Sequence, residues 1–235
     1  MNQETAMDYA QQLQTLLLSA GASEVGFSLL SGHKEGTLIA EYPGSAQLNY
    51  GVTITVKLSD AVVDGITRQP THAYFHHYRT VNALIDQLIV KAGFWIEEQG
   101  FLYLPVAASQ SVDGLQGLFQ HKTAARLSGL GGIGRSGLFL SHRYGCRVRL
   151  GTLITNMPLP PGTPFEGDIC GACTLCASLC PAMAISAEPF SLSVPNDMLD
   201  RRACSDYMKK HFQHIGRGAV CGVCIKHCPA GKRPG

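Results

Sequence analysis

The sequence predicts an α+β protein, with a domain of mixed helices and strands followed by a smaller cysteine-rich domain. Helical and strand-like apolar periodicities follow one another through the first 155 residues, a proline-rich stretch comes next, and eight of nine cysteines crowd into the last 66 residues. The chain has 235 residues, of which 45% are hydrophobic and 15% are charged. This composition supplies a buried core and excludes a coiled coil or a wholly disordered chain.

The first hundred residues predict two helices and two strands. Residues 5–20 place apolar side chains at helical spacing before a glycine, and residues 70–98 do so over a longer stretch that opens on a proline. Residues 23–30 predict a short strand. Residues 52–58 alternate in the manner of a strand and give the clearest such pattern in this part of the chain.

The pattern continues to a proline-rich linker. Residues 101–107 and 147–155 predict strands, and residues 120–127 predict a short helix. Four prolines between positions 158 and 164 then indicate a connection between domains. We therefore expect one domain over residues 1–160 and a second over residues 161–235.

The start of the chain has neither the basic residues nor the apolar stretch of a signal peptide. No run approaches the roughly 18 apolar residues of a membrane span. The cysteines cluster instead of spreading through the fold, which favours metal ligation over a secreted disulfide scaffold. We expect a cytoplasmic protein without membrane contact, and the sequence predicts no oligomeric state.

The cysteine-rich segment opens with the C-x₂-C-x₂-C-x₃-C-P run of bacterial-type ferredoxins, formed by Cys170, Cys173, Cys176 and Cys180. Two-residue spacers let three thiolates converge on one cubane, and the fourth ligates the other cluster. A zinc site normally uses two separated cysteine pairs.

A second run, Cys221, Cys224 and Cys228, lacks its first cysteine, and Cys204 is the natural substitute. The crossed pattern of two-cluster ferredoxins predicts two [4Fe–4S] clusters and one-electron transfer. Their ligands would be Cys170, Cys173, Cys176 and Cys228 for one cluster, and Cys180, Cys204, Cys221 and Cys224 for the other. The ninth cysteine, Cys146, is expected to be a small buried residue.

Positive charge gathers at the end of the chain, where residues 201–235 hold eight lysines and arginines against one acid. One interpretation is that these residues offset the negative charge of thiolate-ligated clusters. The other is that they receive an acidic partner, either nucleic acid or an electron donor of the reduced flavodoxin or ferredoxin type.

Gly129, Gly131 and Gly134 match the spacing of a dinucleotide fingerprint without its context, because a helix pattern precedes them instead of a strand. Glycines that let the backbone approach a flat ligand are the favoured interpretation. Asp113 and His121 flank the preceding loop as candidate proton donors, the alternative being solvated loop residues.

The order of these motifs resembles the epoxyqueuosine reductase family. The resemblance rests on His121 and Lys122 leading into the glycine run, on the segment YGCRVRLGT over residues 144–152, and on the first cysteine run. Members are iron–sulfur and cobalamin enzymes, related to reductive dehalogenases, that reduce the epoxide of epoxyqueuosine in tRNA. The resemblance implies a nitroreductase-like α/β sandwich domain that holds a corrinoid, followed by a ferredoxin-like domain with two clusters.

Carried onto this chain, the resemblance implies that electrons pass from the clusters to a cobalamin and on to an unidentified electrophile, with Asp113 as the candidate acid. The corrinoid would pack against the glycine run and the strand after it, with Gly129, Gly131, Gly134, His121 and Arg147 as its binding residues. Gly132 and Arg135 stand where the family usually has Trp and Lys.

The printed sequence stops soon after the second cysteine run, whereas full-length members continue into a helical-repeat region that helps to hold tRNA. The resemblance is therefore to a short form of the family, and tRNA binding does not carry over with it. Two other function classes stay open beside an oxidoreductase with its own substrate. They are a ferredoxin-like electron-transfer protein and a reductive activator of a separate corrinoid enzyme.

Overall fold

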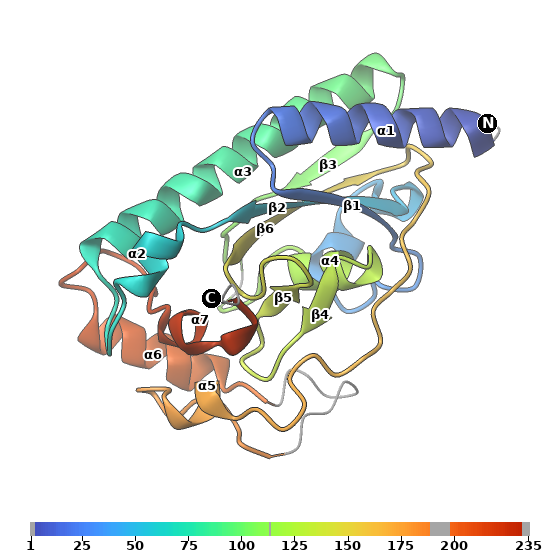
Figure 1. Cartoon of the computed structure of the whole chain (residues 1–235). Helices are drawn as coiled ribbons and strands as arrows, with labels where there is room; N and C mark the ends of the chain where they lie inside the picture. The colour runs from blue at the N-terminus through green and yellow to red at the C-terminus, as the bar shows by residue number, and fades with distance from the viewer. Residues whose placement is uncertain (1–2, 113, 189–197, 232–235) are drawn as a thin grey trace. The chain divides into compact units, whose positions relative to one another are not determined.

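The computed structural model describes residues 3–112, 114–188 and 198–231 (Figure 1). The chain divides into two compact units that interleave in sequence. Unit 1 comprises Met1–Val56, Val81–Leu130 and Arg149–Phe165, and unit 2 comprises Lys57–Thr80, Gly131–Val148 and Glu166–Gly235. The predicted domains, 1–160 and 161–235, are continuous in sequence, whereas unit 2 also takes in two earlier stretches.

Unit 1 is built on a four-stranded sheet with the strand order β1-β2-β6-β3. Its strands are β1 (Glu24–Leu29), β2 (Tyr50–Lys57), β3 (Tyr103–Val106) and β6 (Val148–Thr155). β1 pairs antiparallel with β2, and β3 pairs antiparallel with β6. All four strands were predicted from the alternation of side chains, with ends within two residues of those observed.

Helices cover both faces of this sheet. On one face, Gly151 of β6 lies against Ile85 and Ile89 of α3 (His72–Glu98), so closely that a larger residue would clash with them. The next residue, Thr152, points the other way and hydrogen-bonds His121 of α4 (His121–Leu127). Because successive strand residues face opposite sides, α3 and α4 lie on opposite faces (Figure 1).

The first helix, α1 (Gln3–Ser19), joins α3 on its face of the sheet. Tyr9 of α1 makes edge-to-face ring contacts with Trp95 of α3 and with Phe101 just after it. α1 also contacts β1.

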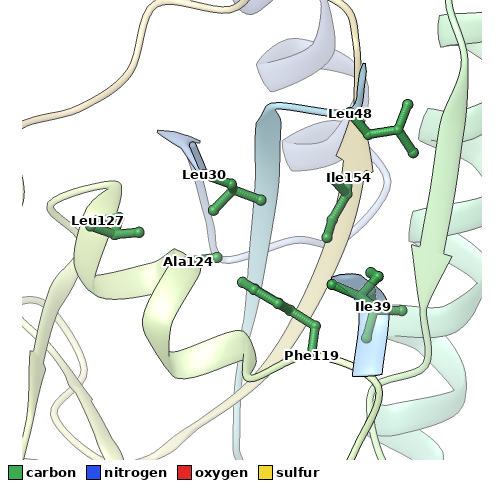
Figure 2. Close-up of a cluster of buried hydrophobic side chains, with 8 residues drawn as sticks. Leu30, Ile39, Leu48, Phe119, Ala124, Leu127 and Ile154 are labelled. Carbon is green, nitrogen blue, oxygen red and sulfur yellow. The ribbon is translucent and has the colours of Figure 1, made fainter. Parts of the chain in front are cut away.

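The core on the α4 face is apolar and well enclosed. Figure 2 shows buried side chains from β6, from α4 and from the loops, with Leu30 just beyond the end of β1. The buried members are Leu30, Ile39, Leu48, Val106, Phe119, Ala124, Leu127 and Ile154. Two short 3₁₀ turns, η1 (Leu38–Glu41) and η2 (Ser45–Gln47), lie in the loop that supplies two of them. A seven-residue helix is not stable alone, so this core fixes α4 and the residue that opens it, His121.

Unit 2 consists of short elements. It holds α2 (Asp60–Asp64), the antiparallel pair β4 (Gly131–Ile133) and β5 (Phe139–Ser141), α5 (Leu175–Ser178), α6 (Arg201–His211), α7 (Val223–His227) and η3 (Pro229–Gly231). α5 and α7 contact each other, and α2 contacts α7. Helices of four or five residues do not stand alone, which is typical of segments that a bound metal group holds together.

Within the described ranges, no helix is both long enough and apolar enough to cross a bilayer.

Candidate iron–sulfur centre

All nine cysteines belong to unit 2, and none forms a disulfide. The eight predicted cluster ligands are partly exposed, and Cys146 is buried. Three ligands lie on helices: Cys176 on α5, Cys204 on α6 and Cys224 on α7. The others lie in the turns beside these helices.

Thiols from the two ends of the cysteine-rich segment influence one another's pKa values, and they form a first set. Burial raises the pKa of Cys176 to about 11, and the charges of Cys170, Cys228 and Cys173 add to this effect. Burial also raises the pKa of Cys170, with a contribution from Cys228. Cys228 therefore stands with the first run, although 48 positions of sequence separate it from Cys180, the last cysteine of that run.

The second set contains the remaining four ligands. Burial raises the pKa of Cys221 to about 11, with contributions from Cys204 and Cys180. The pKa of Cys224 is raised further, by burial first and then by Cys221, Cys204, Cys176 and Cys180. These interactions link Cys228 with Cys170 and Cys176, and link Cys221 with Cys204 and Cys180, while the crossed ligation itself stays a prediction.

One pair of cysteines links the two sets, because the charge of Cys176 also acts on Cys224. These cysteines lie on α5 and α7, the two helices that contact each other. The sets therefore approach each other at Cys176 and Cys224.

Among the residues that the structure describes, no three His, Cys, Asp or Glu side chains stand close enough to hold one metal ion. Since the thiols with raised pKa values are protonated at neutral pH, binding a cluster must displace their protons.

Arg135, which directly follows the glycine run, donates hydrogen bonds to the first cysteine run. Its backbone amide donates to Sγ of Cys170 over 3.3 Å, and its Nε donates to the carbonyl oxygen of Cys173 over 3.1 Å. Its Nη1 donates to the carbonyl oxygens of Ser186 and Glu188. The side chain is buried, and no carboxylate in the described part of the chain forms a salt bridge with it. A buried cation of this kind complements a negatively charged group held by Cys170.

Cys146 lies against the ligands and not merely in a core. It is 2% exposed and its thiol donates to the carbonyl oxygen of Ile225 over 3.4 Å. A hydrogen bond with Cys228 is the main cause that raises its pKa, followed by burial and by the charges of Cys228 and Cys224. The predicted burial is confirmed, but no sequence pattern indicates that Cys146 contacts Cys228 and lies near Cys224.

The residues that the resemblance assigns to a corrinoid divide between the units, and each is engaged by the protein. His121 opens α4 in unit 1, where Nδ1 lies 2.9 Å from Oγ1 of Thr152 and Nε2 lies 2.9 Å from the carbonyl oxygen of Ala107. A carbonyl only accepts, so Nε2 carries the proton and Nδ1 accepts from the hydroxyl. Burial lowers the pKa of His121 to about 4, which keeps the imidazole neutral at pH 7.

The three glycines are each required by a contact within their own unit. Gly129 ends α4 with φ of +74°, and a Cβ there would stand 2.5 Å from the carbonyl oxygen of Thr163. Gly131 lies in β4, directly against the backbone of Leu140, and Gly134 faces the side chains of Leu140 and Cys170. The run thus passes from a helix end into a hairpin, which is not the strand-to-helix turn of a dinucleotide site.

Arg147, in unit 2, is held by two carboxylates. Nη1 pairs with Asp60 over 3.0 Å, and Nη2 pairs with Asp64 over 2.8 Å, while Lys226 also pairs with Asp64 over 2.9 Å. Hydrogen bonds from Arg147 first and Lys226 second hold the pKa of Asp64 well below its usual range. Arg147 thereby ties the segment that follows β5 to α2 within unit 2.

Both ring nitrogens of His121 and both Nη atoms of Arg147 are thus engaged by protein groups, whereas the buried Nε of Arg147 has no hydrogen-bond partner in the described part of the chain. The candidate acid Asp113 lies outside the described residues.

Comparison with known proteins agrees with the cysteine pattern. Residues 169–231 match a 4Fe–4S double cluster binding domain. The chain is 32% identical to the epoxyqueuosine reductase of Aliivibrio fischeri over 60% of its own length and 35% of the relative's. It is 30% identical to that of a Synechococcus species over 68% and 48%. This chain is a relative of the epoxyqueuosine reductases. It is also 32% identical to the tetrachloroethene reductive dehalogenase of Sulfurospirillum multivorans, over 51% and 25%.

Solved structures of both groups share the fold. An epoxyqueuosine reductase solved with a modified tRNA stem loop superposes with a TM-score of 0.61 at 17% identity, covering 95% of this chain and 65% of that one. A B12-dependent reductive dehalogenase superposes with a TM-score of 0.79 at 18% identity, covering 97% and 32%. The chain spans less than half of the curated relatives named above.

Proposed function

We propose that the chain is an iron–sulfur oxidoreductase that moves single electrons through two [4Fe–4S] clusters in unit 2. The observation that carries this proposal is the grouping of eight thiols into two sets of four, each drawn from both ends of the cysteine-rich segment. The match of residues 169–231 to a double cluster binding domain supports the same count.

The clusters, when bound, supply reversible one-electron chemistry, and the chain's own residues hold and tune them. Cys176 and Cys224 would hold the two clusters at their closest approach. Arg135 would stabilise negative charge at the set that contains Cys170, through one N–H and a buried guanidinium.

As the electron acceptor we propose a corrinoid, and beyond it an electrophilic substrate such as an epoxide. Support comes from the relation to epoxyqueuosine reductases and from the fold shared with a B12-dependent dehalogenase. The same relation supports the nitroreductase-like description of the first domain. Among the side chains of the five residues discussed above, the buried Nε of Arg147 is a donor without a partner, and a corrinoid would draw its other contacts from main-chain or side-chain groups elsewhere.

The second candidate is a ferredoxin-like carrier, or a reductive activator of a corrinoid enzyme, without substrate chemistry of its own. One observation favours it: both ring nitrogens of His121 and both Nη atoms of Arg147 are engaged by protein groups, and the three glycines pack against protein atoms.

Anaerobic reconstitution followed by iron and sulfide analysis tests the two clusters. We expect about eight irons per chain, and about four would contradict the proposal. The crossed ligation is tested by pairing variants. Cys180→Ala and Cys204→Ala should remove the same EPR signal, and Cys170→Ala and Cys228→Ala should remove the other. If Cys180→Ala instead resembled Cys170→Ala, the ligand sets would be wrong.

Titration of the reconstituted chain with cobalamin, followed by absorbance and EPR, separates the two candidates. A base-off Co(II) signal is expected for the oxidoreductase. If cobalamin does not bind, the corrinoid-dependent oxidoreductase is ruled out and the electron-transfer protein is favoured.

A further inference from the structure

The exposed side of α6 carries a concentration of positive charge. Arg201, Arg202, Lys209 and Lys210 are exposed, against one exposed acid, Asp206, and we call this group the α6 basic face. None of the four cations forms a salt bridge with a residue that the structure describes. The face is therefore a solvated patch of net charge +3 that is available to a partner.

The α6 basic face is poorly placed to neutralise a cluster. At 3.6 residues per turn, Arg202, Lys209 and Lys210 lie about 120–160° around the helix from Cys204, which is the ligand on α6, whereas Arg201 lies about 60° from it. Cations that compensated the cluster would point toward it, as the guanidinium of Arg135 points toward the first cysteine run. Of the two interpretations of the basic segment, the geometry disfavours local compensation here.

Helix stability does not explain the face either. Lys209 and Lys210 lie in the last turn, where the helix dipole favours cations. Arg201 and Arg202 lie in the first turn, where it disfavours them. The two arginines carry a cost to the helix that a role in binding would account for.

The helix that bears the face also bears a cluster ligand. An α-helix with its side chains is about 10–12 Å across, so a molecule bound to the outer face stands within one helix diameter of Cys204. This is a position for a redox partner. A patch of roughly 16 Å, the length of eleven helical residues, suits the small interface of a transient electron-transfer complex.

We propose that the α6 basic face docks an acidic one-electron carrier protein, which delivers electrons to the cluster held by Cys180, Cys204, Cys221 and Cys224. The inference rests on the proposed function. One electron leaves the reduced carrier, which is oxidised, and enters that cluster, which is reduced; no atom is transferred. Long-range attraction between the carrier and the face raises the rate of encounter and falls with ionic strength.

Stopped-flow reduction of the anaerobically reconstituted chain by reduced flavodoxin, an acidic carrier, tests the proposal. Arg202→Glu and Lys210→Glu should each lower the second-order rate constant, and together they should lower it on the order of tenfold at low salt. Asp206→Asn should raise the rate constant, a gain that misfolding cannot produce. Lys91→Glu, an exposed substitution in unit 1 with the same change in net charge as either single variant, should leave it unchanged.

Three further measurements separate the possible failures. Iron content and the midpoint potentials of all variants should match the wild type, because a compensating role would instead shift a potential. Reduction by methyl viologen radical should not slow, because a small cation needs no acidic docking. If the clusters fail to assemble in the wild type, the proposed function fails. If they assemble and the flavodoxin rates do not change, the docking site is wrong. If only the affinity for an RNA oligonucleotide falls in the variants, the face binds nucleic acid instead.

Discussion

The backbone amide of Arg135 donates a hydrogen bond to Sγ of Cys170 over 3.3 Å, which joins the end of the glycine run to the first predicted cluster ligand. The buried guanidinium of the same residue reaches the backbone of Cys173 three positions later. One residue thus supplies both an N–H to a ligand sulfur and a positive charge beside it. Hydrogen bonds to sulfur and local charge are two of the properties that set cluster potentials.

Replacing Arg135 should therefore shift one cluster and not the other. In Arg135→Gln the charge is lost while the backbone N–H stays, so the midpoint potential of the cluster on Cys170 should fall and that of the second cluster should hold. Redox titration followed by EPR measures both. Arg135→Lys keeps the charge but not the fork of donors, and we expect a smaller shift. Equal shifts in the two clusters would contradict the assignment.

The same substitution should destabilise unit 2 before any iron is bound. Arg135→Gln leaves backbone carbonyl groups, including that of Cys173, without their charged donor. We expect the free energy of unfolding of the apoprotein to fall by about 2–4 kcal/mol, as measured by urea denaturation. A change below about 0.5 kcal/mol would show that water replaces the lost donors.

Cys146 should tune a cluster without ligating it. Cys146→Ala removes the thiol that is hydrogen-bonded with Cys228, so iron should stay at about eight per chain while the potential of that cluster falls. Cys146→Ser retains a donor and should lie closer to the wild type. Loss of about four irons in Cys146→Ala would show instead that Cys146 is a ligand.

His121 should make the fold sensitive to mild acid. Its pKa is about 4 in the folded chain against an ordinary value of 6.5, so protonation favours the unfolded state as the pH falls below 6.5. Between pH 7 and pH 5 the wild type should lose about 2 kcal/mol more unfolding free energy than His121→Gln, as measured by urea denaturation of the apoprotein. Parallel losses in the two proteins would mean that other groups govern the acid response.

Arg147 should act as a structural anchor. Arg147→Met removes the buried partner of Asp60 and Asp64, and we expect the unfolding free energy to fall, as measured by urea denaturation. Lys226→Met is the matched control, because it breaks only a more exposed pair with Asp64 and should lower the unfolding free energy less than Arg147→Met does. Equal losses of unfolding free energy in the two variants would show that Arg147 is not a structural anchor.

Local pattern was enough to predict the elements of unit 1. The alternation over residues 52–58 and the long helical periodicity over residues 70–98 correspond to β2 and α3, since each has one dominant apolar spacing. The spacing of the cysteines also predicted iron–sulfur binding, which the match of residues 169–231 to a 4Fe–4S double cluster binding domain supports, because ligand spacing is itself a local signal.

Contacts distant in sequence were not predictable in the same way. Gly131 forms part of a strand because its backbone lies against that of Leu140, and nothing in a run of glycines distinguishes this from a ligand-binding loop. The contacts of Arg135 with Cys170 and of Cys146 with Ile225 span 35 and 79 positions. The replacement of lysine by Arg135 was the one available sign, and its meaning required the fold.

The grouping of Cys228 with the first run has a consequence for how the chain is made and degraded. If each cluster draws on both ends of the segment, neither cluster can be completed until synthesis has passed Cys224, and a nick in the intervening stretch would loosen both at once. Iron shortage should therefore leave a protease-sensitive chain and not a half-loaded one. Both clusters would then assemble together, once the last cysteine ligands of the segment are available.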